Sequence, residues 1–282
     1  SILLILAVGQ TFVIATSGID LSVGSVLVFS SVVATIATIG VGEAIGDPES
    51  PVAVFAGLGA GLVSGLAWGV LNGFLIAVAR IPALIVTLGS MGMAMGFAQI
   101  ITGGNDLRGL PAALTSTVGS GRLFGVIPYL VIISAVVAVI AALVLNKTRF
   151  GRYTLAIGSD EEATRRQGIS VRVHLVKVYA LSGLLAGLAG WLSIARFGAT
   201  TINGHGSANL DTIAAVVLGG TSLFGGIASI FGTVVGVFIP TVLKNGFTII
   251  GVEPFWQNVA VGAVLIAAVY YDQRRRRARD RR

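Results

Sequence analysis

The sequence contains no cysteine, so it can form neither a disulfide framework nor a thiolate metal site. It also carries little charge, because only 11% of its 282 residues are Asp, Glu, Lys or Arg, whereas soluble domains carry about 25%. Its two histidines, His174 and His205, lie in different segments and make no clustered metal site. The absence of any Gly-Lys dipeptide excludes a Walker A phosphate-binding motif, and no HExxH motif occurs. We therefore expect neither an enzyme nor a bound cofactor or metal.

Apolar residues dominate the chain instead. Hydrophobic residues make up 55% of the sequence, and the mean hydropathy is +0.92. Several apolar runs reach the roughly 20 residues that a helix needs to cross a bilayer. The 39 glycines are typical of helices that pack closely in lipid. We predict an all-α fold: a polytopic membrane protein with one transmembrane domain over residues 1–282.

The apolar runs predict about nine membrane spans. The seventh run is about half a span long, and the eighth is interrupted by Gly225-Gly226 and Pro240. Because the sequence starts with Ser1 inside an apolar run, we expect that the native chain begins earlier and contains a tenth span. The predicted spans are 2–17, 22–40, 52–79, 83–101, 127–145, 176–195, 210–220, 224–247 and 255–271.

Positive charge concentrates in two segments. Seven Lys or Arg residues lie in or next to a polar loop at 147–175, and seven arginines lie in a tail at 272–282. Cytoplasmic loops of membrane proteins carry an excess of Lys and Arg. We therefore predict that the loop and the basic tail are cytoplasmic. Residues 41–50 contain three acidic residues and no basic one, which suits a loop on the outer side.

Two stretches of the sequence share an order of short motifs. Gly18-Ile19-Asp20-Leu21 precedes Leu71-Asn72-Gly73-Phe74, and Asn209-Leu210-Asp211 precedes Lys244-Asn245-Gly246-Phe247. In the predicted topology the first stretch starts at the inner face of the membrane and the second at the outer face. This order predicts an inverted repeat with broken or half-length helices, which is typical of transporters. Chance resemblance between apolar, glycine-rich segments is the alternative.

A short helix is predicted inside the cytoplasmic loop, over residues 160–167. Ser159 is placed to cap its N-terminus, with Glu162 three residues later, as in a capping box. Its first turn is acidic, its last turn is basic, and Gly168 can take the left-handed conformation that ends a helix. Since a helix this short is marginal in water, it is either a contact for a cytoplasmic partner or a solvated connection. The candidate contact residues are Ser159, Asp160, Glu161, Glu162, Ala163, Thr164, Arg165, Arg166 and Gly168.

Five polar residues near the predicted spans are candidates for a solute pathway. A carboxylate inside a span costs about 2.5–3.5 kcal/mol, so it usually faces a cavity or a partner. The two carboxylates lie at predicted segment starts, where they can instead cap a helix N-terminus, and we favour capping for both. The amides either bridge helices or bind a polar solute. The candidates are Asp20, Ser22, Asn72, Asn209 and Asp211.

The sequence resembles the permease subunits of bacterial ribose/xylose/galactose-type ABC sugar importers. Four motifs carry the resemblance in the same order, and together they are specific and extend over nearly the whole chain. They are GQTFVIATSGIDLSVGSV (9–26), NGFLIAVARIPALIVTLG (72–89), TRFGRYTLAIGSDEEATRRQGISV (148–171) and LDTIAAVVLGGTSLFGG (210–226).

The resemblance implies a multi-pass protein of the bacterial cytoplasmic (inner) membrane that pairs with a second copy of itself. It implies two cytoplasmic ATPase subunits, which bind ATP and Mg²⁺, and a periplasmic or lipid-anchored sugar-binding protein; nucleic acid plays no part. The coupling helix of the family, which contacts the ATPase, corresponds to residues 160–167. Members of the family often have Glu where this chain has Asn209, so the resemblance assigns no particular sugar.

The predicted function is ATP-driven import of a monosaccharide or related polyol by alternating access. A related ABC permease for nucleosides or branched-chain amino acids is one alternative. An ion-coupled secondary transporter is another, and its solute flux would depend on a proton or sodium gradient and survive loss of the 160–167 helix. A membrane scaffold without transport is the third, and the glycine-rich broken spans argue against it.

Overall fold

The computed structural model of the protein describes residues 1–253, 256, 257, 259, 260, 262, 263, 266, 267 and 270. The predicted span at 255–271 lies only partly within this range, and the basic tail at 272–282 lies outside the described residues. The described chain is a helical bundle and confirms the predicted class of polytopic α-helical membrane protein.

Six described helices are long and apolar enough to cross a bilayer, and two further apolar helices, α1 and α9, are shorter. The six are α2 (Val23–Ile45), α3 (Pro51–Ala77), α4 (Ala83–Thr102), α5 (Tyr129–Lys147), α8 (Val171–Phe197) and α10 (Ile230–Ile249). The other elements are α1 (Ile2–Ala15), the π-helix η1 (Leu114–Gly119), the strands β1 (Arg122–Leu123) and β2 (Ile127–Pro128), α6 (Arg149–Ser159), α7 (Glu161–Arg166) and α9 (Ala208–Leu218).

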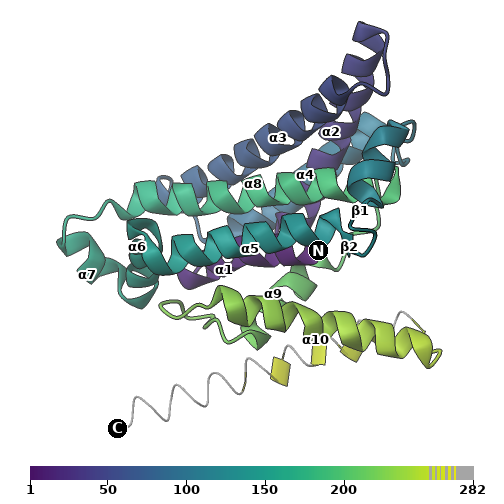
Figure 1. The fold of residues 1–282 in the computed structure, drawn as a ribbon. Helices are drawn as coiled ribbons and strands as arrows, with labels where there is room; N and C mark the ends of the chain where they lie inside the picture. The colour runs from purple at the N-terminus through teal and green to yellow at the C-terminus, as the bar shows by residue number, and fades with distance from the viewer. Residues whose placement is uncertain (254–255, 258, 261, 264–265, 268–269, 271–282) are drawn as a thin grey trace.

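The helix α1 lies at the centre of the bundle. It is apolar on nearly every side, and all of its residues from Ile5 to Ala15 are buried. A helix that is hydrophobic all round is typically buried, with other helices packed around it. The helices α5, α8, α9 and α10 all pack against α1 (Figure 1). These four helices therefore share α1 as a packing partner.

The helices α3 and α8 pack with their backbones in contact. A Cβ atom at Gly65 would lie 2.3 Å from the carbonyl oxygen of Gly183 on α8, and a Cβ at Gly69 would lie 2.3 Å from that of Tyr179. Small residues allow membrane helices to approach this closely, and van der Waals contact then holds the helices together. Glycine recurs every four residues along α3, so these positions share one face of the helix. The glycines are Gly57, Gly61, Gly65, Gly69 and Gly73.

The connections gather at the two ends of the bundle. Figure 1 shows α6 and α7 at one end, and η1 with the β1–β2 hairpin at the other. At the hairpin end the carboxylate of Glu49 accepts hydrogen bonds from the backbone N–H groups of Ala112 and Ala113, at 2.9 and 2.7 Å. These bonds lower the pKa of the Glu49 carboxyl, because they stabilise its charged form. The α2–α3 connection is thus tied to the segment that leads into η1.

The polar segment at 149–159 was predicted as a loop, and that prediction is wrong: it forms α6. The helix is amphipathic, with Gly151, Thr154, Ile157 and Gly158 buried on one face. The hydroxyl of Thr148 accepts a hydrogen bond from the N–H of Gly151 at 3.3 Å and caps its N-terminus. The positive charges of the segment therefore lie on a helix whose other face packs on the bundle.

Three predicted span boundaries differ from the structure by five residues or more. The predicted span at 224–247 begins only at Ile230, because Gly225 and Gly226 form a turn with φ of +80° and +76°. The helix α2 continues to Ile45 and ends at Gly46 in the left-handed conformation. The helix α8 starts at Val171 rather than at 176 and so includes the charged residues near the predicted loop. The short seventh segment is confirmed as the eleven-residue helix α9.

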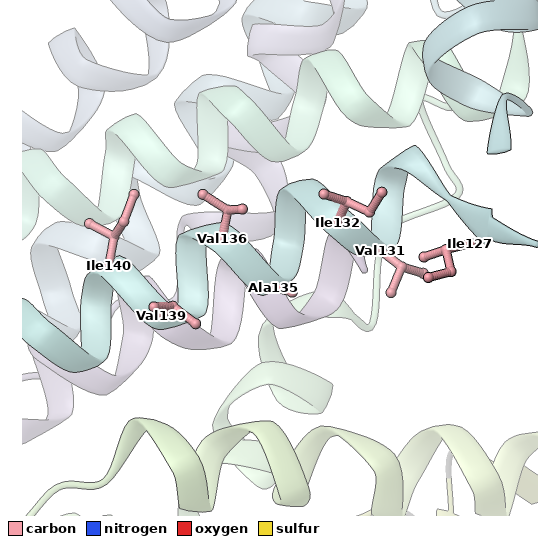
Figure 2. A pocket seen from close by; sticks show the side chains of 7 residues that line it. All are labelled: Ile127, Val131, Ile132, Ala135, Val136, Val139 and Ile140. Atoms are coloured by element: carbon pink, nitrogen blue, oxygen red, sulfur yellow. The ribbon is translucent and has the colours of Figure 1, made fainter. Parts of the chain in front are cut away.

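The helices of the periphery expose apolar faces, as lipid contact requires. Figure 2 shows one such face on α5, where the side chains border a shallow pocket of about 360 Å³. No polar side chain lines the pocket, so it offers a sugar hydroxyl no side-chain hydrogen bond. The face suits acyl chains, and we exclude it as a solute site. Its lining residues are Ile127, Val131, Ile132, Ala135, Val136, Val139 and Ile140.

Candidate functional site

A buried polar cluster lies where the chain leaves α1 and begins α2. It joins α1, α2, α3, α4 and α8 through side-chain hydrogen bonds, and each member has an exposed fraction of 2% or less. Polar groups this deeply buried need hydrogen-bond partners to offset their loss of hydration. The members of the cluster are Gln10, Asp20, Ser22, Asn72, Ser90 and Ser182.

Asp20 organises the start of α2. One carboxylate oxygen accepts from the backbone N–H of Ser22 at 2.9 Å and from its hydroxyl at 2.6 Å, and the other accepts from the hydroxyl of Ser182 at 3.1 Å. With its amide oriented to satisfy both groups, Gln10 on α1 pairs with the backbone N–H and C=O of Asp20, each at 3.2 Å. The carboxylate thus bonds the backbone at a helix N-terminus, as the capping interpretation expects.

Asn72 bridges three helices. Its amide nitrogen donates to the hydroxyl of Ser22, the N-cap residue of α2, at 2.9 Å, and its amide oxygen accepts from the hydroxyl of Ser90 on α4. Both ends of the amide are therefore engaged with the protein. Of the two interpretations that the sequence leaves open, this conformation shows the helix bridge.

Replacing Asn72 by leucine is expected to lower the free energy of unfolding by roughly 1–3 kcal/mol, because the buried hydroxyls of Ser22 and Ser90 each lose their amide partner. Thermal unfolding of the detergent-purified protein, followed by tryptophan fluorescence, measures the change. The matched control is Asn245→Leu, at an exposed position on α10, where no loss is expected. Equal effects of the two substitutions would contradict the bridging role.

Asn209 connects the N-termini of α2 and α9. Its amide oxygen accepts from the backbone N–H of Gly24 at 2.9 Å, and its amide nitrogen donates to the sulfur of Met91 on α4 at 3.2 Å. A Cβ atom at residue 24 would lie 2.4 Å from that amide oxygen, so the contact needs a glycine there. Asn209 thus caps α2 from a segment 185 residues away in the sequence.

The capping interpretation is wrong for Asp211. It lies in the first turn of α9, but its carboxylate oxygen binds the ammonium group of Lys244 on α10 at 2.5 Å and accepts from the hydroxyl of Ser207 at 3.1 Å. The exposed fractions of the Asp211 and Lys244 side chains are 12% and 28%, so the ion pair is partly buried. Asp211 therefore connects α9 to α10.

Hydrogen bonds to other segments of the chain fix the α8–α9 connection at several residues. The backbone N–H of Ile202 donates to Asp106 at 2.7 Å, and the hydroxyl of Thr200 accepts from the N–H of Leu107 at 2.7 Å. Nε2 of His205 lies 3.0 Å from the hydroxyl of Ser193. Burial lowers the pKa of His205, so its ring is neutral at neutral pH. These bonds hold the connection that leads to Asn209 and Asp211.

The second candidate element, α7, forms where a short helix is predicted but starts at a different cap. Asp160, rather than Ser159, is its N-cap, and the carboxylate of Asp160 accepts from the N–H of Ala163 at 2.9 Å. Glu162 does not close a capping box, because it pairs with Arg165 and Arg166. Gly168 has φ of +81°, as predicted for the residue that ends the helix. The helix runs from Glu161 to Arg166.

The surface of α7 is exposed, and its base is fixed to the bundle through α6. The side chains of Glu162, Arg165 and Arg166 are 51%, 58% and 78% exposed. At the end of α6, the carbonyl oxygen of Gly158 accepts from the hydroxyl of Ser17, 3.2 Å away. A Cβ at Gly158 would lie 1.9 Å from the carbonyl oxygen of Ala15, the last residue of α1. The end of α6, directly before α7, is therefore in backbone contact with the end of the central helix.

A groove of about 820 Å³ lies between α7 and the turn that joins α3 to α4. Its polar wall contains Glu161, Glu162 and Arg165 from α7, and its opposite wall contains Arg80, a residue with positive φ of +59°. The groove places α7 next to a connection between two membrane helices. This neighbourhood does not follow from the sequence order, since 80 residues separate Arg80 from Asp160.

Sequence reasoning missed three residues that the structure brings into these sites. Ser90 and Ser182 lie inside apolar runs and carry no motif, and Lys244 stands out in the sequence only as part of a repeat. A serine or a lysine inside an apolar run is the signal that could have identified them, because lipid disfavours such side chains unless they have partners. Among the residues that the structure describes, no three His, Asp or Glu side chains lie close enough together to hold a metal ion.

Comparison with known proteins gives one family. The model of a family described as "Branched-chain amino acid transport system / permease component" matches residues 1–269. No solved structure matches the chain.

Three curated proteins illustrate the similarity. The ribose import permease protein RbsC of Escherichia coli K12 is 40% identical over 274 residues, which are 96% of this chain and 82% of that protein. The fructose import permease protein FrcC of Rhizobium meliloti is 36% identical over 275 residues, 95% of this chain and 74% of that protein. The galactose/methyl galactoside import permease protein MglC of Haemophilus influenzae is 33% identical over 287 residues, 96% of this chain and 83% of that protein.

Proposed function

The chain belongs to the family of branched-chain amino acid transport system permease components, and we propose that it is the membrane-spanning subunit of an ATP-driven sugar importer. The observation that carries the proposal is its identity of 33–40%, over at least 95% of the chain, with permeases named for ribose, fructose and galactose import. The proposed cargo is a monosaccharide or a related polyol. A neutral cargo suits a chain with so few charged residues.

We assign ATP hydrolysis to partner subunits rather than to this chain. The sequence has no Gly-Lys dipeptide and hence no Walker A motif. The partners in the proposal are a second copy of the chain, two cytoplasmic ATPase subunits that bind ATP and Mg²⁺, and a sugar-binding protein outside. The exposed, charged surface of α7 is the proposed contact with the ATPase, over residues 160–167.

The proposed topology places the 147–175 loop and the 272–282 tail in the cytoplasm of a bacterium, with about nine spans in the numbered region. In its support, α6 and α7 lie at the end of the bundle opposite the β1–β2 hairpin (Figure 1). The proposed inverted repeat needs one correction: its two sets of motifs do not start at opposite faces of the membrane, because Asn209 accepts a hydrogen bond from the backbone N–H of Gly24 at 2.9 Å, so the two starts lie side by side.

The proposed mechanism is alternating access driven through α7. Closure of the ATPase pair on ATP would displace α7, and α6 would carry that displacement to Ala15 and to Gly226, whose N–H donates to the carbonyl oxygen of Ala15 at 3.0 Å. The turn before α10 would move with the end of α1. The proposed solute pathway passes Asn209 and Asp211, while the more deeply buried Asp20, Ser22 and Asn72 support it from within the bundle.

Transport in proteoliposomes tests the proposal. We expect that the chain, together with its ATPase and binding protein, takes up at least one labelled monosaccharide among ribose, fructose and galactose in an ATP-dependent manner. Addition of ionophores that collapse the proton and sodium gradients should leave the initial rate unchanged, because ATP supplies the driving force. Leucine and uridine serve as comparison solutes.

Two results would contradict the proposal in different ways. ATP-dependent uptake of leucine or uridine, without uptake of any sugar, would identify a related permease with another cargo. Uptake that needs an ion gradient and proceeds without ATP would identify a secondary transporter.

A further inference from the structure

The helix α10 consists of two halves that are held to the bundle in different ways. Its fully buried residues all lie at or before Pro240. In this first half, a Cβ at Gly232 would lie 1.9 Å from the carbonyl oxygen of Gly219, and a Cβ at Gly236 would lie 2.0 Å from that of Ala215. The hydroxyls of Thr233 and Thr11 lie 2.7 Å apart and join this half to α1. The first half is therefore fixed by backbone contact.

The second half, residues 241–249, has no fully buried residue. Its contact with α9 continues the buried stripe of the first half, since Lys244 follows Pro240 by four residues on the same face. At that position the contact is the ion pair with Asp211. Among the described residues, this is the one ion pair that joins two different helices; the other two lie within α7.

Pro240 separates the two halves. Proline has no N–H, so the carbonyl group of Gly236 loses its helical hydrogen bond, and the helix can bend at this point. The hydroxyl of Thr241 donates to the carbonyl oxygen of Val237 at 2.7 Å, across the same turn. A first half fixed by backbone contact, a bend point and a second half joined to α9 by an ion pair are the parts of a hinged arm. In the second half, the hydroxyl of Thr248 also accepts a hydrogen bond from the side-chain amide of Gln257 at 3.3 Å.

We propose that the Asp211–Lys244 ion pair is a latch, which holds residues 241–249 of α10 against α9 and which opens as α10 bends at Pro240. Three features support a contact that closes and opens. The two charges are partly exposed, so water can replace each partner on opening, whereas a fully buried pair would leave unpaired charges. Ser207 remains beside Asp211 as a neutral hydrogen-bond donor. The first half of the helix need not move.

Distances between spin labels test the latch directly. The sequence has no cysteine, so pairs of cysteines can be introduced for labelling without background. One label at the exposed residue Val139 on α5 is the reference, paired with a label at Ile249 in the second half or at Phe231 in the first half. Pulsed electron paramagnetic resonance gives the distance distribution of each pair.

We expect that Lys244→Met and Asp211→Asn each broaden the 139–249 distribution and add a second population, while the 139–231 distribution stays as in the unmodified chain. The charge-swapped variant D211K/K244D should restore a single population. Lys177→Met, at an exposed lysine of α8, is the matched control and should change neither distance.

The latch is overturned if Lys244→Met leaves the 139–249 distribution unchanged, if both distributions broaden together, or if the charge swap does not restore the single population. These readouts need neither cargo nor ATP. Only the role of the latch in the transport cycle rests on the proposed function. If the labelled chain does not gain the second population when the ATPase and ATP are added, that role is overturned while the latch itself stands.

Discussion

Replacing Gly65 by alanine is expected to prevent correct folding of the chain, whereas replacing Gly59 by alanine should leave it as stable or more stable. The single added carbon at residue 65 would lie 2.3 Å from the carbonyl oxygen of Gly183 and 2.7 Å from the backbone nitrogen of Gly187. A Cβ at Gly59 would meet no atom within 4 Å. The same chemical change should therefore have opposite effects at two positions on one helix.

The collision at Gly65 cannot be relieved by a side chain that turns away, because its partners are backbone atoms of α8. The two helices would have to separate, and the neighbouring contact of Gly69 with Tyr179 would open with them. Overpacking costs about 3 kcal/mol or more where the surroundings cannot yield. At the exposed Gly59, alanine gains up to about 1 kcal/mol from its better helix propensity.

Size-exclusion chromatography of the detergent-extracted protein, with a fluorescent tag, measures the folded fraction of both variants. Thermal midpoints of the surviving protein give the order of stability. We expect the Gly65→Ala variant in the aggregate peak or with a strongly lowered midpoint, and the Gly59→Ala variant in the main peak. A stable, monodisperse Gly65→Ala variant would show that α3 and α8 are not in backbone contact.

The membrane class and most helices could be predicted from the sequence because the hydrocarbon of a bilayer permits few backbone structures. Backbone groups in hydrocarbon must bond within the segment, so long apolar runs become helices. The order of apolar runs up to α5, and the short length of α9, follow from hydropathy and turn residues alone. The glycine stripe on α3 is also visible in the sequence, as a glycine at every fourth position from 57 to 73.

The predicted boundaries failed where polar residues belong to helices. The segment of α6 contains Arg149 and Arg152, which suggest a loop, but Thr154 and Ile157 fall on one buried face. Around α7, Ser159 and Asp160 are both good N-cap residues, and the sequence does not decide between neighbours. Because α6 continues through Ser159, the cap falls on Asp160.

The contacts of the candidate site could not be predicted, because each joins residues far apart in the sequence. Asn209 bonds Gly24, and Asp211 pairs with Lys244 after a reversal of the chain. A carboxylate at the start of a helix is most simply a cap, and for Asp20 that interpretation agrees with the structure. For Asp211 the nearby lysine of α10 is the stronger partner, and only the packing of α9 on α10 brings it there.

The second large effect is expected for the double variant E162A/R165A, which should lose at least about tenfold in ATP-driven sugar uptake. The two substitutions remove two of the three charged side chains that α7 presents at the groove, and they leave Glu161 and the N-cap hydrogen bond to Asp160 in place. Since Glu162 and Arg165 are more than half exposed, their removal should not unfold the chain. The loss would come from the contact with the ATPase, through which force must enter if α7 is the coupling helix.

The experiment compares uptake and ATP hydrolysis in the same proteoliposomes. We expect that the double variant still forms a monodisperse protein, while sugar-stimulated hydrolysis and uptake fall together. The control variant E43A/K147A removes one acid and one base at exposed positions outside α7, so its net charge matches. It should transport normally.

Full uptake by the α7 variant would mean that force enters elsewhere, and uptake without ATP would mean that no ATPase drives the chain. A loss confined to the α7 variant would instead identify this six-residue helix, fixed through α6 to the end of α1, as the point where ATP hydrolysis acts on the membrane helices.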